Sequence, residues 1–382
     1  MNRIFIVFLT MSFLLINLAG CSKSAPDVLG KYDFAEAFHE GLAMVGKYTE
    51  DGSRCGFIDK KGKEIVPFIY DQATNFSEGF ACVQQGNEWF YIDKTGKELN
   101  SARYDIAYPF SEGLARIYVD EQFGYIDTEG NEIIAPKYDD AHPFSEGLAL
   151  VGNDSKYGYI DKSGEEVISL KYDGGFAFSE GAAAVSSNGK VGYIDTDGNE
   201  LIPFLYDKAD NFSEGMASVG MRTDYGYAWG FVDKTGREII PPQYDDYFVF
   251  SEGLAAVRLD GRCGYIDKTG KVVIPLNYFK SYPFSDGRGL VLGDNTYATH
   301  GFVDKDGNEV ILLQYGDTTG SFSEGLANVV KDGKRGYIDV DGKVVVPLVS
   351  GILENDPVKD GMAKISIDEY TFVYFINIED YK

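Results

Sequence analysis

Histidine, cysteine and tryptophan are scarce in this chain, which has three, four and two of them among its 382 residues. The three histidines, His39, His142 and His300, stand in no spacing that holds a metal, and no two cysteines form a C-x-x-C pair. A nucleophile elbow, a phosphate-binding loop and a dinucleotide fingerprint are all missing from the sequence. We therefore expect no metal, no cofactor and no catalytic centre.

The chain has few positive charges. It contains 35 Lys and Arg and 60 Asp and Glu, which gives a net charge of −25. A protein that binds nucleic acid needs a cationic surface that displaces counterions from the phosphates. The same deficit argues against a basic patch that would bind anionic lipids. We expect neither DNA nor RNA among the partners.

A long apolar run occurs at the start of the chain. Arg3 precedes the apolar segment Ile4–Leu18, which is too short to span a bilayer comfortably and has the length of a signal-peptide core. The segment ends in Leu18-Ala19-Gly20-Cys21, which resembles the lipobox of bacterial lipoproteins. The alternative is an ordinary secretory peptide with a chance cysteine.

The lipobox resemblance implies a compartment. It implies that residues 1–20 are a signal peptide, that Cys21 carries lipid such as palmitate, and that residues 21–30 are a tether. Several acyl chains hold a protein firmly, whereas one chain binds marginally. The expected location is thus the membrane of the bacterial cell envelope, and Ser22 leaves sorting to the outer membrane open.

One sequence block repeats along the rest of the chain. The chain holds 27 Tyr, 26 Phe and 45 Gly, a composition typical of strands punctuated by tight turns. The block Phe-Ser-Glu-Gly-Leu-Ala recurs with its first residue at Phe38, Phe76, Phe110, Phe144, Phe178, Phe212, Phe250, Phe284 and Phe322, and a decayed tenth copy lies at 358–363. Each block is followed by Gly-Tyr-Ile-Asp, and this Asp also begins the segment Asp-x-x-Gly. An apolar pair comes next, often with a Pro, and Tyr-Asp ends the repeat.

Each repeat predicts a small β unit. Tyr-Ile and Ile-Ile favour strands, and Asp-x-x-Gly between them fits a type I turn whose Gly takes the left-handed conformation of a three-residue hairpin loop. Leu-Ala-x-Val supplies a third strand. The unit is therefore a three-stranded meander with a connector that carries Tyr-Asp and Phe-Ser-Glu-Gly and has room for one helical turn.

Such a meander cannot bury its apolar face alone, but neighbouring copies can do so by stacking. We expect an all-β tandem-repeat domain over 31–382, arranged as an open solenoid-like stack of about ten three-stranded units. A β-propeller-like ring is the alternative, which ten units disfavour because propellers usually have about four to eight blades. The expected units are 31–68, 69–102, 103–136, 137–170, 171–204, 205–242, 243–276, 277–313, 314–347 and 348–382.

The repeat resembles the WG repeat of many bacterial proteins, named for a Trp-Gly pair before Tyr-Ile-Asp. The pair survives in Trp229-Gly230-Phe231-Val232-Asp233, and Trp89 holds the Trp position of the second copy. Most other copies have lost that Trp. The resemblance implies a binding or surface module without assigned catalytic residues.

Insertions single out one loop as a candidate binding site. Copies one, six and eight are longer than the others between Leu-Ala-x-Val and Tyr-Ile-Asp, and repeat arrays often collect insertions on their binding face. Exposed aromatic residues suit recognition of sugar or protein. The candidates in these loops are Tyr48, Tyr225, Tyr227, Trp229 and Tyr297. Functionless variation in loop length is the simpler alternative.

Two further residue sets have structural interpretations. The acid of Phe-Ser-Glu-Gly recurs in every copy, and we expect it to accept backbone N–H bonds at the connector turn rather than to form a cation-binding ladder. Cys55, Cys82 and Cys263 are expected to be buried free thiols, with one disulfide as the alternative.

The sequence thus predicts a non-enzymatic, lipid-anchored scaffold that binds a protein or a glycan. A structural envelope spacer without a dedicated ligand is the second hypothesis. A glycoside hydrolase is the third and the least favoured, because each recurring carboxylate already has a structural role in its turn.

Overall fold

The computed structural model describes residues 29–293, 299–316, 319–367 and 372–378. The predicted signal peptide, Cys21 and Tyr297 lie outside the described residues. The described chain is all-β and divides into two compact units, which we call unit one (Met1–Asn75 with Phe284–Lys382) and unit two (Phe76–Pro283).

Unit two holds most of the repeats. Its strands are β7 (Phe80–Gln85), β8 (Glu88–Asp93), β9 (Ile106–Ser111), β10 (Leu114–Val119), β11 (Gln122–Asp127), β12 (Glu132–Tyr138), β13 (Asp140–Ala141), β14 (Leu148–Asn153), β15 (Lys156–Asp161), β16 (Glu166–Tyr172), β17 (Gly174–Gly175), β18 (Ala182–Ser187), β19 (Lys190–Asp195), β20 (Glu200–Tyr206), β21 (Lys208–Ala209), β22 (Met216–Thr223), β23 (Gly226–Asp233), β24 (Glu238–Tyr244), β25 (Asp246–Tyr247), β26 (Leu254–Leu259), β27 (Arg262–Asp267) and β28 (Val272–Tyr278).

Unit one is built from both ends of the chain. Its strands are β1 (Leu29–Tyr32), β2 (Phe34–Ala35), β3 (Leu42–Thr49), β4 (Gly52–Asp59), β5 (Glu64–Tyr70), β6 (Gln72–Ala73), β30 (Arg288–Leu292), β31 (His300–Val303), β32 (Glu309–Tyr315), β33 (Leu326–Lys331), β34 (Lys334–Asp339), β35 (Val344–Val349), β36 (Ile352–Asn355), β37 (Met362–Ile367) and β38 (Phe372–Asn377). Strand β29 (Lys280–Ser285) contains the boundary between the units.

The fourth copy illustrates the repeated sheet. Strands β14, β15 and β16 form the predicted antiparallel meander, in which Ala149 pairs with Ile160 and Tyr159 with Ile168. The connector adds a fourth strand, β13, which pairs with β14 at the other edge. Where the structure describes them completely, the connectors contain no helical turn.

The hairpin loop between the second and third strands of the meander has the predicted geometry. The amide of Gly164 donates to the carbonyl of Asp161 at 2.9 Å, and the Asp161 carboxylate accepts from the amides of Ser163 and Glu165 at 2.9 and 3.0 Å. Gly164 has φ of 84°, the left-handed conformation expected of the glycine in this loop.

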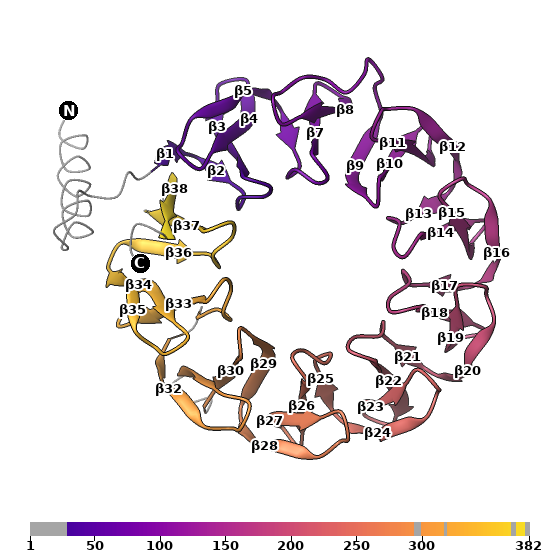
Figure 1. Cartoon of the computed structure of the whole chain (residues 1–382), viewed down its shortest axis with the longest axis vertical. Helices are drawn as coiled ribbons and strands as arrows, with labels where there is room; N and C mark the ends of the chain where they lie inside the picture. Colours follow the sequence, from indigo (N-terminus) through magenta and orange to yellow (C-terminus); the bar gives the residue numbers. More distant parts are fainter. Residues whose placement is uncertain (1–28, 294–298, 317–318, 368–371, 379–382) are drawn as a thin grey trace. The chain divides into compact units, whose positions relative to one another are not determined.

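Aromatic contacts between copies make the core of unit two continuous. Phe144 of the fourth connector packs against Tyr125 of the third copy with ring centroids 5.0 Å apart, and Phe212 packs in the same way against Tyr193. All four rings are buried. Figure 1 shows the sheets of unit two side by side along an arc, with β13, β17, β21 and β25 inside and β16, β20 and β24 outside.

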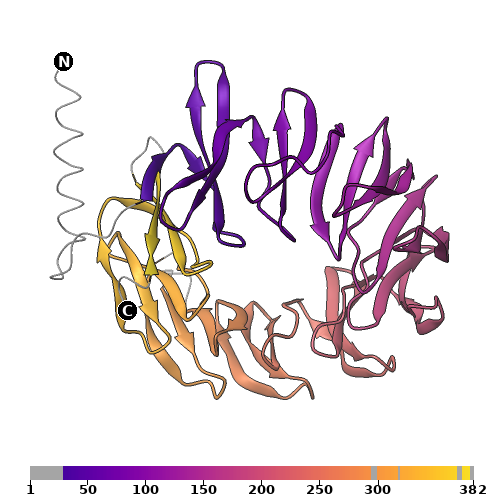
Figure 2. The same ribbon diagram turned by 45° about the horizontal axis from the view of Figure 1, so that its top comes forward.

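The first and tenth copies meet within unit one. Strand β1 pairs with β38, so the start of the domain completes the sheet of the last copy (Figure 2). Phe38 packs edge-on against Phe375 at 4.9 Å, and the Asp360 carboxylate accepts from the Gly41 amide at 2.9 Å. These terminal copies therefore contact each other as sequential copies do. The expected all-β array of tandem repeats is confirmed.

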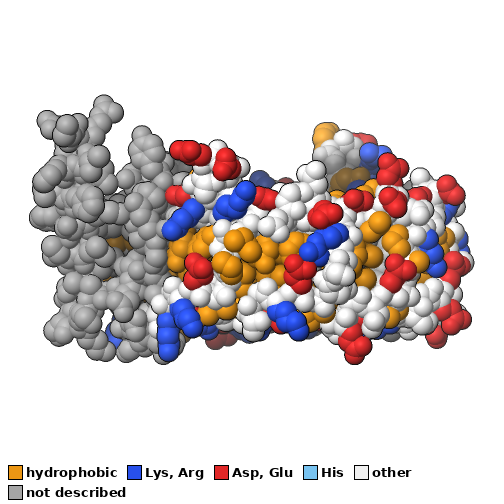
Figure 3. Space-filling view, turned by 90° about the horizontal axis from the view of Figure 1, so that it is seen from above, with side chains coloured by type: hydrophobic (Ala, Val, Ile, Leu, Met, Phe, Trp, Pro, Cys, Tyr) orange, Lys and Arg blue, Asp and Glu red, His pale blue; other side chains and the backbone are white. Residues whose placement is uncertain are grey.

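One face of the molecule is mixed rather than uniformly acidic. On the face shown in Figure 3, acidic side chains are scattered among basic, apolar and neutral ones. Within the described part of the chain, no helix has the length and apolar character needed to cross a membrane.

Candidate binding surfaces

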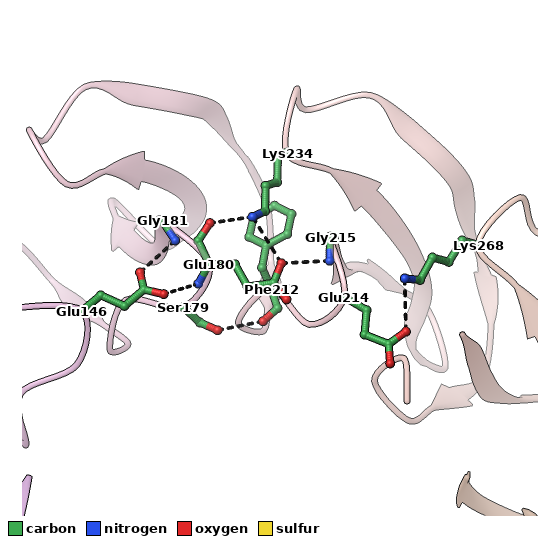
Figure 4. A network of polar contacts seen from close by, with 9 residues as sticks. All are labelled: Glu146, Ser179, Glu180, Gly181, Phe212, Glu214, Gly215, Lys234 and Lys268. Carbon is green, nitrogen blue, oxygen red and sulfur yellow. Dashed lines mark hydrogen bonds and ion pairs between the residues drawn. The ribbon is translucent and has the colours of Figure 1, made fainter. Parts of the chain in front are cut away.

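The Phe-Ser-Glu-Gly turn joins each copy to the next one in unit two (Figure 4). Ser179 Oγ donates to the carbonyl of Phe212 at 2.9 Å. The Glu146 carboxylate accepts from the amides of Glu180 and Gly181 at 2.6 and 2.8 Å. The expectation that these carboxylates serve as backbone acceptors is therefore confirmed, with the difference that the amides belong to the following copy.

Lysines neutralise part of this carboxylate series. Lys162 lies 3.2 Å from Glu112, and Lys234 lies 3.2 Å from Glu180. Burial opposes ionisation of the Glu112 carboxyl, but the Gly147 amide and Lys162 outweigh it and hold the pKa of Glu112 below its usual range. The recurring acids are thus part of the scaffold, and we look elsewhere for a binding surface.

The long hairpin of copy six presents aromatic side chains at its end. Strands β22 and β23 have eight residues each, against six in the hairpin of copy four, and Tyr225 at the tip is fully exposed. Tyr227 and Trp229 follow on the same face of β23, half-buried, with ring centroids 6.0 Å apart. The inserted residues therefore lengthen a regular hairpin instead of forming an irregular loop.

A residue of the next copy supports this aromatic group. Tyr247 of β25 lies 4.5 Å from Trp229, measured between ring centroids. The Tyr247 hydroxyl donates to the carboxylate of Asp210, which also accepts from Ser218 Oγ at 2.8 Å. Because these bonds fix Tyr247, Trp229 rests on a rigid base. We call Tyr225, Tyr227, Trp229 and Tyr247 the hairpin-six cluster.

The structure separates the predicted binding residues into two groups. Tyr225, Tyr227 and Trp229 lie together in unit two. Tyr48 lies on the β3–β4 hairpin of unit one, where it is 67% exposed and its ring stands 5.5 Å from that of Phe34. Tyr297 lies outside the described residues.

A second set of aromatic residues escaped the sequence interpretation. In unit two the position two residues before the connector Phe is occupied by a ring in five copies. These residues, which we call the connector row, are Tyr108, His142, Phe176, Phe248 and Tyr282. Phe176 and Phe248 are exposed, and the Phe248 ring lies 6.1 Å from that of Tyr282. An alignment of the copies on their connector Phe would have shown that several of them have a ring at this position.

The cysteines of the described chain are buried thiols that form no disulfide, as expected. Burial raises the pKa of the Cys55 thiol to about 12, with a further contribution from the Asp71 carboxylate. Burial also raises the pKa of Cys263. Neither thiol is therefore ionised near neutral pH, and neither is a nucleophile there.

Comparison with known proteins identifies the repeat. The family profile of the WG containing repeat matches residues 30–48, 56–89, 89–122, 123–157, 157–190, 192–221, 229–263, 264–297 and 301–334. No curated protein matches the chain.

Similarity to solved structures is remote. The tricorn protease aligns with 94% of this chain over 44% of its own length, at 12% identity and a TM-score of 0.26. Puromycin hydrolase aligns with 90% of the chain over 58% of its own length, at 12% identity and a TM-score of 0.34. Kluyveromyces lactis Hsv2 aligns with 69% of the chain over 93% of its own length, at 8% identity and a TM-score of 0.33. The chain spans about half the length of the first two proteins, and TM-scores this low carry no argument about its activity.

Proposed function

Since the chain belongs to the family of WG containing repeats, we propose that it is a non-enzymatic binding scaffold of the bacterial envelope, anchored through lipid at Cys21. Its partner is a protein or a glycan, which it binds through the hairpin-six cluster. One observation carries the proposal: Tyr225 stands fully exposed at the tip of a regular hairpin, beside rings that a hydrogen-bonded tyrosine supports.

The physical argument rests on the rigidity of this aromatic surface. Tyr and Trp supply a large contact area at low conformational cost, and they dominate binding energies when a scaffold holds them in place. The eight-residue pairing of β22 with β23 runs from Met216–Asp233 to Thr223–Gly226, so the hairpin is paired up to its tip. A partner that stacks on these rings would therefore meet a preformed surface.

The test compares the amount of partner captured by the full chain with the amount captured by the variant Tyr225→Ala. Purified envelope polysaccharides and envelope proteins are presented separately, which distinguishes a glycan from a protein partner. Tyr225 touches little of the fold, so its loss is expected to leave stability unchanged and to lower capture about tenfold, the effect of ~1.4 kcal/mol.

Phe176→Ala provides the matched control, since Phe176 is another exposed aromatic residue of unit two, 49% exposed, on the connector row. We expect it to retain full capture of the partner. Equal capture by both variants and by the unchanged chain would exclude the hairpin-six cluster as the binding surface.

A structural spacer is the second candidate, and the bonds between copies favour it. In every pair of consecutive copies from Ser77 to Ser213, the serine of one turn donates to the connector Phe carbonyl of the next copy. Such an array is suited to bridging a distance. Under this hypothesis Tyr225→Ala would leave the cellular phenotype unchanged, whereas deletion of two copies would impair it.

A further inference from the structure

Copy one holds a cavity at a place where copy six is filled by aromatic side chains. Its hairpin has the same length, with eight-residue strands β3 and β4, so positions of the two copies correspond one to one. The register confirms the match, because Gly46 pairs with Cys55 in copy one and Gly220 pairs with Trp229 in copy six.

Three aromatic residues of copy six are replaced by small ones at this place. Ser53 stands where copy six has Tyr227, and Cys55 stands where it has Trp229. On the following connector, Ala73 of β6 stands where Tyr247 of β25 supports the Trp229 ring. The residues that remain line an open pocket of about 290 Å³. This is close to the lower limit of roughly 300 Å³ for small-molecule pockets.

Two other aromatic side chains, Phe34 and Tyr48, form the walls of the cavity. In copy six the Trp229 ring lies over Gly220, within 3.0 Å of the point where a Cβ would stand. In copy one Phe34 covers Gly46 from the opposite strand, β2, and the pocket lies beside the buried Cys55. Tyr48 forms a second wall, with its ring 5.5 Å from that of Phe34 and tilted by 44°.

The floor and rim of the cavity have distinct chemistry. Met44 and Cys55, both buried, line the floor, and a thioether makes favourable contacts with aromatic rings. The polar lining consists of Ser53, Gln72 and Asp71, whose oxygens are able to accept an N–H or O–H bond. The Asp71 carboxylate is paired with Arg54. The cavity therefore has two ring walls, an apolar floor and polar acceptors at its mouth.

We propose that this cavity binds a planar aromatic ring with a polar edge, such as an indole or a phenol, carried by a small molecule or by a peptide side chain. The ring would occupy the space that Tyr227 and Tyr247 take in copy six and that Phe34 leaves free in copy one. It would lie against Phe34 and Tyr48, with its polar edge at the rim. All lining residues belong to unit one, so the site is independent of the hairpin-six cluster and of the function proposed above.

The experiment uses the full chain with 13C-labelled methionine methyl groups and indole as the probe. Met44 reports on the cavity. Met221 reports on the hairpin of copy six, and Met362 reports on the core of unit one. We expect a saturable shift of the Met44 methyl resonance and none at Met221 or Met362. Octahydroindole, which has a similar outline but no aromatic ring, is expected to produce no shift. An unmoved Met44 signal, or equal shifts of all three methyl groups, would overturn the proposal.

Two variants test the position of the site. Ser53→Tyr combined with Ala73→Tyr places the corresponding tyrosines of copy six in the cavity and should abolish the indole-dependent shift. Tyr48→Ala removes a wall from an exposed position, where folding is not at risk, and should weaken indole binding about tenfold. Unchanged resonances of Met216 and Met362 verify the fold. If both variants fold and bind indole as before, the assignment of the cavity is wrong.

A second arm distinguishes the two sources of the ring. N-acetyl-tryptophanamide and the tripeptide Gly-Trp-Gly are titrated beside indole. Binding of all three identifies an aromatic side chain of a peptide as an acceptable occupant, whereas binding of indole alone identifies a small molecule. Both results support an aromatic-ring site, and binding of none of them contradicts it.

Discussion

Ser179 and Phe212 are joined by a hydrogen bond of 2.9 Å from the serine hydroxyl to the phenylalanine carbonyl, across the boundary between copies five and six. The next serine, Ser213, repeats the bond to Phe250 at 3.0 Å, four residues further along the chain than in the shorter copies. The bond is therefore kept although the copies differ in length, which makes it part of the contact between copies rather than of the turn alone.

Removal of one such hydroxyl should weaken the array. Ser179→Ala leaves the half-buried carbonyl of Phe212 without this donor, and a typical intramolecular hydrogen bond contributes about 1 kcal/mol. We expect the urea midpoint of unfolding to fall accordingly. Ser101→Ala, at an exposed loop position, is the control and should leave the midpoint unchanged. The same midpoint for both variants would show that the bond contributes nothing.

Acid should loosen the contacts between copies. Burial opposes ionisation of Glu112 and Glu180, but backbone amides and lysines outweigh it, so the pKa of each carboxyl is depressed in the folded chain. A depressed pKa contributes stability above the ordinary glutamate value of 4.5, and this stability is lost as the pH falls through the folded-state pKa. Melting temperatures measured from pH 7 down to pH 3 should therefore fall below pH 4.5.

The variant Glu112→Gln with Glu180→Gln separates these two groups from the other acids. It should be less stable than the unchanged chain at neutral pH. The Gln amide has one acceptor oxygen where the Glu112 carboxylate uses two, and it carries no charge to attract Lys162 or Lys234. Its stability should also depend less on pH between 3 and 5. Parallel pH profiles of the two proteins would contradict the role assigned to these carboxylates.

The repeat could be predicted from sequence because its signals are local. Asp161 and Gly164 lie three residues apart, and the turn that they form depends on that spacing alone. The fourth strand was missed, since Asp140–Ala141 is a two-residue segment with no strand pattern of its own and is held by pairing with Gly152 and Val151. The bond partners of Glu146 were placed in its own turn, because nothing in one copy indicates that the amides come from the next.

The candidate site, too, could be predicted from sequence only where its residues lie in one strand. Tyr227 and Trp229 are two residues apart in a strand, so their common face follows from the sequence. Tyr247 lies in another copy, and its contact with Trp229 depends on how the copies stack. The cavity beside Cys55 could not be predicted either. It results from small residues at Cys55 of copy one and Ala73 of copy two, and only the structure shows that the two positions lie together.

Two glycines with similar backbone conformation should differ in their tolerance of alanine. Gly164 has φ of 84° and Gly189 has φ of 75°, so a Cβ costs each about 1 kcal/mol. A Cβ at Gly164 would in addition stand 3.0 Å from Ile134 of the preceding copy, whereas nothing lies within 4 Å of one at Gly189. We expect Gly164→Ala to lower the urea midpoint more than Gly189→Ala. The reverse order would mean that the copies are packed less tightly at this turn.

The buried tyrosine hydroxyls should also contribute to stability. Tyr159 is fully buried and donates to the carbonyl of Phe176 at 2.8 Å, in the connector that follows. Tyr159→Phe keeps the packing and removes the bond, so we expect a loss of about 1 kcal/mol in urea unfolding. Tyr225→Phe removes an exposed hydroxyl and should have no effect. An equal change in both variants would indicate that the buried bond is not stabilising.

The proposed anchor predicts a chemical modification. If Cys21 is lipidated, cells grown with an alkyne analogue of palmitate should incorporate the label into this protein, and the protein should fractionate with membranes. Cys21→Ser should abolish both labelling and membrane association, because the thiol that carries the lipid is gone. Cys55→Ser is the matched control, since Cys55 is buried in the fold and its variant should retain both. Labelling that persists in Cys21→Ser would place the lipid elsewhere, and a soluble, unlabelled native protein would exclude the lipid-anchored scaffold.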